Sequence, residues 1–105
     1  MTNDRLTAIL AELVMGWGVG PDRFMMDGRR WLPRWRFRPT ENLTDAFKVL
    51  EKAAPQEYSM GADVRGFWVR VRIGTTVGEA RSTSKPRAVT FAVARAVGID
   101  PGANG

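Results

Sequence analysis

The chain has 105 residues, enough for one domain with a single modest hydrophobic core. It contains neither cysteine nor histidine, which excludes disulfide bonds, thiolate catalysis and the commonest metal ligands. Sixteen basic and eleven acidic residues give a net charge of +5, and thirteen of the sixteen are arginine. This balance favours partners that carry phosphate or acidic protein surfaces, although a genome rich in G and C also favours arginine codons.

A helix is predicted over residues 3–15, where apolar residues recur along one helical face. Those residues are Leu6, Ile9, Leu10, Leu13 and Val14. Thr2 or Asn3 can cap its start, and Gly16 can end it. No apolar run reaches the roughly 18 residues of a membrane span, and the N-terminus does not have the pattern of a signal peptide.

A short hairpin is predicted near residues 23–32, because Asp27-Gly28 lies between two runs of apolar and basic residues. Three of the four tryptophans fall in the surrounding segment 16–39. In a short hairpin, the run Phe24-Met25-Met26 can form an exposed apolar edge. Such an edge pairs with another chain, which predicts either a homodimer or contact with a host protein.

The second half of the chain predicts a helix, a three-stranded antiparallel meander and a last helix. The second helix covers residues 41–53, with Thr40 or Asn42 as its cap. Strands follow near 58–62, at 67–73 and at 76–82, and the last helix covers 85–97 with Ser84 as its cap. Residues 1–100 therefore form a single α+β domain, and residues 101–105 are expected to be a disordered tail.

Four segments resemble the phage ABA sandwich domain, a family of small proteins encoded by phages and prophages. They are Val14-Met15-Gly16-Trp17, Pro39-Thr40 with the following segment 43–52, Phe67-Trp68-Val69, and Ser84-Lys85-Pro86-Arg87-Ala88-Val89. The resemblance implies a small α/β/α sandwich, in which the meander combines with an N-terminal, a central and a C-terminal helix. It also implies a phage or prophage origin, and hence the cytoplasm of the host cell, but no activity. Two departures are the arginine-rich segment 23–38 and Arg87, where the family has an acidic residue.

The arginine-rich segment is the main candidate for a ligand site. Its arginines alternate with aromatic residues: Arg23, Phe24, Arg29, Arg30, Trp31, Arg34, Trp35, Arg36, Phe37 and Arg38. Guanidinium groups bind phosphate bidentately, and aromatic rings stack on bases. We therefore predict that Arg29, Arg30, Trp31, Arg34, Trp35, Arg36 and Arg38 bind a nucleotide or nucleic acid. In the alternative, the aromatic residues fill the core and the arginines form a solvated rim.

Arg70 and Arg72 are further candidates, because they share one face of the 67–73 strand with Trp68. Helices on both faces of the sheet would bury these arginines, which is costly. Either the face is partly open, or the arginines pair with carboxylates. An open face next to the segment 23–38 would form one continuous basic surface with it. The alternative is the ordinary exposed face of an antiparallel meander.

Nothing in the sequence indicates catalysis, a metal site or a cofactor, so we expect a protein that is not an enzyme. The leading hypothesis is an accessory protein that counters host defence by binding a nucleotide signal or a nucleic acid. A second hypothesis is an interaction module that inhibits a host defence nuclease, as an anti-CRISPR protein does, since Trp and Arg dominate protein interfaces. A third is a component of the virion or of its assembly.

Overall fold

Three helices and two small antiparallel sheets make up the computed structural model, which describes residues 1–102. The helices are α1 (Asn3–Leu13), α2 (Leu43–Ala53) and α3 (Lys85–Ala96). One sheet is the meander of β4 (Glu57–Asp63), β5 (Gly66–Ile73) and β6 (Thr76–Ser82). The other contains β1 (Gly18–Val19), β2 (Arg23–Met25) and β3 (Trp31–Pro33), and the 3-10 helix η1 (Arg34–Arg36) follows it. The predicted α+β class is confirmed.

A polar side chain caps the start of each α-helix. The side chain of Thr2 accepts a hydrogen bond from the backbone N–H of Arg5 at 3.1 Å. The caps of α2 and α3 are Asn42 and Ser84, so Asn42 rather than Thr40 is the cap of α2. Helix α1 ends at Leu13, two residues before the predicted end, and the chain turns at Gly16 with φ at 73°.

The meander has one buried and one open face. Val69 and Val71 of β5 are almost completely buried and face α3, which packs across β5 and β6. Arg70 and Arg72 alternate with them and face away from the helices. Gly78 of β6 lies directly beneath α3, so that the backbones of strand and helix nearly touch.

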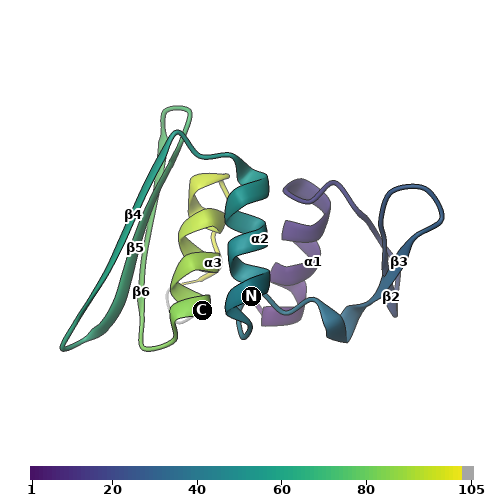
Figure 1. The fold of residues 1–105 in the computed structure, drawn as a ribbon, viewed down its shortest axis with the longest axis horizontal. Coiled ribbons are helices and arrows are strands. Elements are labelled where there is room, and N and C mark those ends of the chain that lie inside the picture. Colours follow the sequence, from purple (N-terminus) through teal and green to yellow (C-terminus); the bar gives the residue numbers. More distant parts are fainter. Residues whose placement is uncertain (103–105) are drawn as a thin grey trace.

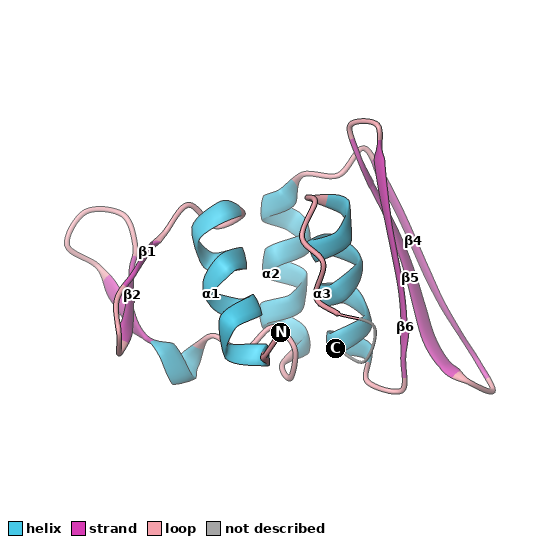
Figure 2. Ribbon diagram, turned by 180° about the vertical axis from the view of Figure 1, so that it is seen from behind, coloured by secondary structure: helices cyan, strands magenta, loops and turns pink. Residues whose placement is uncertain are grey.

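The three helices lie between the two sheets, as Figures 1 and 2 show. The order of layers is therefore sheet, helices, sheet, and the meander has helices on one face only. The reason is the side-chain pattern of the meander, because its outer face carries charged residues that are costly to bury. The long axis of the molecule measures 43 Å, and the two sheets form its opposite ends.

The small sheet is built around an aromatic cluster. The rings of Trp17, Phe24 and Phe37 lie with their centroids 5.0 to 5.9 Å apart. The predicted hairpin is confirmed, with its turn at Gly28. The predicted apolar edge at Phe24-Met25-Met26 is wrong, because β2 is the central strand and Phe24 is fully buried. The sequence pattern was misleading because the strand that covers this side of β2, β1, is only two residues long and is not recognisable from the sequence.

The chain after α3 folds back onto the domain. Pro101 is buried, and the guanidinium group of Arg95 donates a hydrogen bond to the carbonyl of Gly102 at 3.3 Å. These two residues of the predicted tail therefore pack against the domain. The rest of the predicted tail, residues 103–105, lies outside the described residues.

Candidate functional site

A cleft of about 420 Å³ lies between the first turns of α1 and the segment that leads from β3 to α2. Three of the predicted ligand-binding residues line it: Arg34, Trp35 and Arg38. The opposite wall consists of polar residues from α1, including Asn3 and Asp4. This volume falls within the usual range for sites of small ligands.

Arg34 is the most constrained cation of the cleft. The helix η1 begins at this residue, and its backbone N–H donates to the carbonyl of Asp22 at 3.1 Å. Its half-buried side chain lies over the ring of Phe24, 5.5 Å from the centroid. The guanidinium group makes two long hydrogen bonds, to the carbonyls of Gly20 at 3.4 Å and Asp4 at 3.5 Å. Within residues 1–102 no carboxylate forms an ion pair with it.

Arg38 and Trp35 are exposed at the rim of the cleft. The guanidinium group of Arg38 forms an exposed ion pair with Glu41 at 3.1 Å. Its backbone N–H donates to the carboxylate of Asp45 at 3.0 Å, which fixes the chain just before α2. The side chain of Trp35 is 66% exposed, and the guanidinium group of Arg36 lies 5.5 Å from its ring centroid.

The carboxylates of the cleft are mostly neutralised by arginines of the same chain. The side chain of Asp22 accepts two hydrogen bonds from Arg23, at 3.1 and 3.3 Å, and these bonds lower the pKa of the Asp22 carboxyl. Glu41 is paired with Arg38. Asp4 is the lining carboxylate that has no ion pair within the described residues. Arg34 and Asp4 are therefore the two charged lining residues that have no ion pair within residues 1–102.

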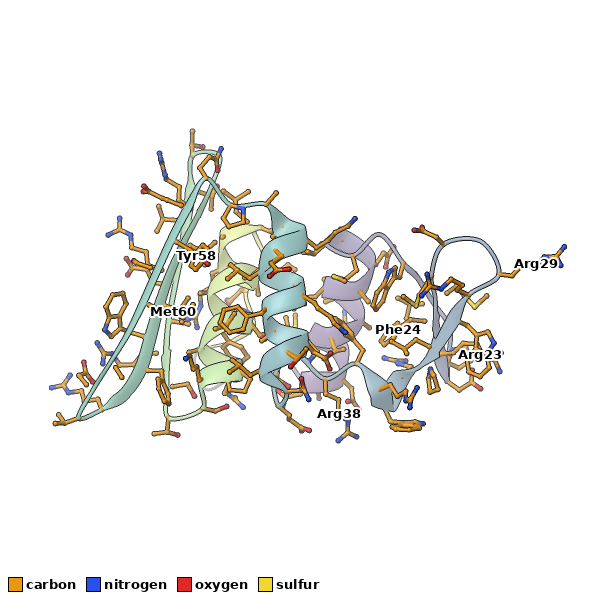
Figure 3. The ribbon with its side chains drawn as sticks, viewed as in Figure 1. Arg23, Phe24, Arg29, Arg38, Tyr58 and Met60 are labelled. Atoms are coloured by element: carbon orange, nitrogen blue, oxygen red, sulfur yellow. The ribbon has the colours of Figure 1, made fainter. Side chains whose placement is uncertain are left out.

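Three other predicted residues, Arg29, Arg30 and Trp31, lie outside the cleft on the hairpin. We call the exposed group that they form with Arg23 and Met25 the hairpin surface. Trp31 is 53% exposed, lies opposite Met25 across the two strands, and has the guanidinium group of Arg23 4.7 Å from its ring centroid. Figure 3 shows Arg29 pointing away from the body at the tip of the hairpin.

Arg70 and Arg72 belong to β5, in the meander at the other end of the molecule, so their face does not form one continuous basic surface with the segment 23–38. The meander and the hairpin are separated by the layer of helices. The outer face is both open and internally paired. Its three ion pairs are Arg70 with Glu79 at 3.5 Å, Arg72 with Glu57 at 3.2 Å and Arg81 with Asp63 at 2.6 Å. Equal numbers of opposite charges make this face a poor attractant for a polyanion.

The sequence did not predict the α1 side of the cleft, and two of the aromatic residues in the arginine-rich segment are part of the core. Phe24 and Phe37 belong to the core, as the alternative interpretation predicted for the aromatic residues. Asn3 and Asp4 line the cleft, but polar residues in the first turn of a helix are so common that they gave no signal. Within the described residues, no group of three or more acidic side chains could hold a metal ion.

Comparison with known proteins gives a family and a fold. The family model of the Phage ABA sandwich domain matches residues 8–94. A crystal structure of a phage protein from Bacillus cereus ATCC 14579 has a similar fold, with a TM-score of 0.77 and 20% sequence identity. The similarity covers 97% of this chain and 93% of that chain. No curated protein matches the sequence. In residues 1–102, no helix combines the length and apolar character needed to cross a membrane.

Proposed function

Since this chain belongs to the phage ABA sandwich domain family, we propose that it is a phage or prophage accessory protein that binds a phosphate-bearing ligand of nucleotide size. The proposed site is the cleft lined by Arg34, Trp35 and Arg38. The protein acts by binding and not by catalysis. In an infected cell, such binding would withdraw a nucleotide signal of the host's defence.

The observation that carries this proposal is the half-buried guanidinium group of Arg34, which has no carboxylate partner among the described residues. A partly buried cation is stabilised by an anion nearby, and a phosphate fits the planar guanidinium group bidentately. The present hydrogen bonds of Arg34, at 3.4 and 3.5 Å, are longer than the usual N–H···O distance of about 2.7 to 3.2 Å. A phosphate oxygen can replace them with shorter, charge-assisted bonds.

Arg38 and Trp35 supply the other two contacts. An exposed ion pair such as Arg38 with Glu41 contributes at most about 1 kcal/mol, so Arg38 can exchange Glu41 for phosphate at little cost. Trp35 leaves most of its ring accessible, and stacking of a base on an aromatic ring contributes about 1 to 3 kcal/mol. Two cations and one ring within a single cleft match the phosphates and the base of a nucleotide.

Isothermal titration calorimetry with three probes tests the proposal. The probes are adenosine triphosphate, cyclic diguanylate and a short oligothymidylate, each at low salt. We expect at least one to bind, and we expect Trp35→Ala or Arg38→Ala to weaken that binding about tenfold or more. The matched control is Arg72→Ala, which also removes one arginine from an exposed ion pair, but at the opposite end of the molecule.

Native mass spectrometry of the protein purified from phage-infected cells extends the test beyond these probes. A bound mass of nucleotide size would support the proposal and give the class of the ligand. If no probe binds and no such mass is found, the proposal is wrong. It is equally wrong if Arg72→Ala weakens binding as much as Arg38→Ala, because the effect would then come from net charge alone.

The hairpin surface favours a second candidate function, the docking of a host defence protein. Trp31 and Met25 are exposed side by side, and Arg23 covers one face of the Trp31 ring, which leaves less of it for stacking on a base. Aromatic and arginine side chains in such an arrangement are typical of interface hot spots. Co-purification of a host polypeptide that is lost in Trp31→Ala, but retained in Trp35→Ala, would favour this function.

A further inference from the structure

The strand β4 is an edge of the meander with unused backbone hydrogen-bonding groups. In the order β4-β5-β6, β4 pairs with β5 alone. Asp63 and Gly66 flank a two-residue turn and form a hydrogen-bonded pair, so alternate residues of β4 bond to β5. The N–H and C=O groups of Tyr58, Met60 and Ala62 therefore point away from β5. Within residues 1–102 no backbone group bonds to them.

The other edges of the two sheets are partly blocked or very short, and β4 is neither. On β6, the guanidinium group of Arg95 donates to the outward carbonyl of Glu79 at 2.7 Å. In the small sheet the edge strands have only two and three residues, and β3 ends at Pro33. The seven residues of β4 contain neither proline nor lysine, the residues that commonly block edge strands. Figure 1 shows β4 along the margin of the sheet with no helix over it.

We propose that β4 pairs antiparallel with β4 of a second copy of this chain, which joins the two meanders into one continuous sheet. A two-fold axis at Met60 places Met60 opposite Met60, Tyr58 opposite Ala62 and Ser59 opposite Gly61. Apolar residues then meet apolar residues on the helix side of the sheet, and small residues meet on the outer side. Tyr58, which Figure 3 labels on β4 near Met60, is 54% exposed in one copy and gains an apolar neighbour from the second.

The charges of the strand permit this pairing. Glu57 and Asp63 come opposite each other at its two ends, and like charges at such positions are unfavourable. Each of them already has an arginine partner within its own copy, Arg72 for Glu57 and Arg81 for Asp63. A second copy thus meets a β4 strand whose charged ends are already paired with arginines and whose central residues are apolar or small. The β4 edge binds a partner through strand backbone, which a polyanion does not have. The β4 edge and the proposed ligand cleft are therefore distinct binding surfaces.

Sedimentation velocity from micromolar to submillimolar protein tests the dimer. We expect the unmodified chain to form dimers and Met60→Pro to weaken dimerisation about tenfold or more. Proline removes an N–H group that points outward, so the bonds to β5 remain. The matched control is Val77→Pro, which removes an outward N–H group from the β6 edge. Circular dichroism shows whether either variant has lost the fold.

A cysteine variant gives a second test that does not depend on proline. The chain has no cysteine, so Met60→Cys introduces a single thiol. Directly opposed residues of a hydrogen-bonded pair have Cα atoms about 5.5 Å apart, within the reach of a disulfide. We expect Met60→Cys to cross-link much faster than Val64→Cys in the exposed turn. A monomer at every concentration, dimerisation that Met60→Pro leaves unchanged, or equal cross-linking of the two cysteine variants would overturn the proposal.

Discussion

Gly78 sets the distance between the meander and the helices. A Cβ atom at this position would lie 2.1 Å from the carbonyl oxygen of Ala92 and 2.4 Å from the backbone nitrogen of Ala96. Both are backbone atoms within α3, so neither can turn aside. Small residues on α3 and a glycine on β6 therefore work together to let helix and strand approach closely. The helix can then cover Val69 and Val71 of the neighbouring strand.

We expect Gly78→Ala to lower the free energy of unfolding by about 3 kcal/mol or more, because the helix must move away from the sheet. Urea denaturation followed by circular dichroism measures the change. The matched control is Gly61→Ala, whose Cβ would lie 2.7 Å from ring atoms of Trp68. That ring is a side chain on the open face and can rotate, so we expect a loss below about 1 kcal/mol. Equal losses in the two variants would contradict this account.

At the scale of single residues, the sequence shows which side chains are present more readily than which way each side chain points. The alternation from Phe67 to Ile73 correctly predicted that Arg70 and Arg72 share one face of β5 with Trp68, because a strand of eight residues has a clear period of two. The strands β2 and β3 have three residues each, too few for a period to be recognised. Nothing in the sequence therefore shows that Phe24 is buried while Trp31 is exposed.

At the scale of elements, the long ones were predictable and the short ones were not. The three helices and the meander follow from periodicity, caps and turns, with ends within a few residues of those observed. Strand β1 and helix η1 have two and three residues, and tertiary contacts hold them in place. The sequence shows that arginines are concentrated in the segment 23–38, but not which of them lie together in space. Which residues of this segment share a cleft depends on η1, which places Arg34 and Trp35 beside α1.

The turn between β4 and β5 is held by one carboxylate. Asp63 accepts hydrogen bonds from the guanidinium group of Arg81 at 2.6 Å and from the backbone N–H of Arg65 at 2.8 Å. These bonds, the first above all, lower the pKa of the Asp63 carboxyl. A lowered pKa means that the stabilisation is complete above the ordinary pKa of aspartate. It is lost as the pH falls through the lowered value.

We therefore expect Asp63→Asn to lower the melting temperature slightly near neutral pH, and the difference to vanish as the pH falls through the lowered pKa of the Asp63 carboxyl. Melting curves of both proteins across this range measure it. The control is Glu12→Gln, which removes one charge from α1 where the described residues provide no ion pair. A difference for Asp63→Asn that stays constant down to the lowest pH would show that the carboxylate charge does not stabilise the turn.

At the scale of the whole molecule, the layer of helices separates two ends with different chemistry. The end with the hairpin and the cleft carries arginines that its own carboxylates do not fully balance, whereas the outer face of the meander is internally paired. The ends lie apart along the 43 Å axis. Direct electrostatic influence between them is weak in physiological salt, where charges are screened beyond about 8 Å.

This separation predicts opposite responses to salt. Binding of a phosphate-bearing probe in the cleft should weaken as sodium chloride increases, because salt screens the attraction to Arg34 and Arg38. Dimerisation through β4 should become stronger, because each copy carries a net charge of +5 and salt screens the repulsion between copies. Titration calorimetry and sedimentation velocity over the same salt series measure the two. We also expect Met60→Pro to leave the affinity for the probe within about twofold of the original value. If both processes change in the same direction with salt, one of them does not depend on charge as expected. If Met60→Pro alters both dimerisation and probe binding, the cleft and the β4 edge are coupled, and the molecule does not have two independent binding surfaces.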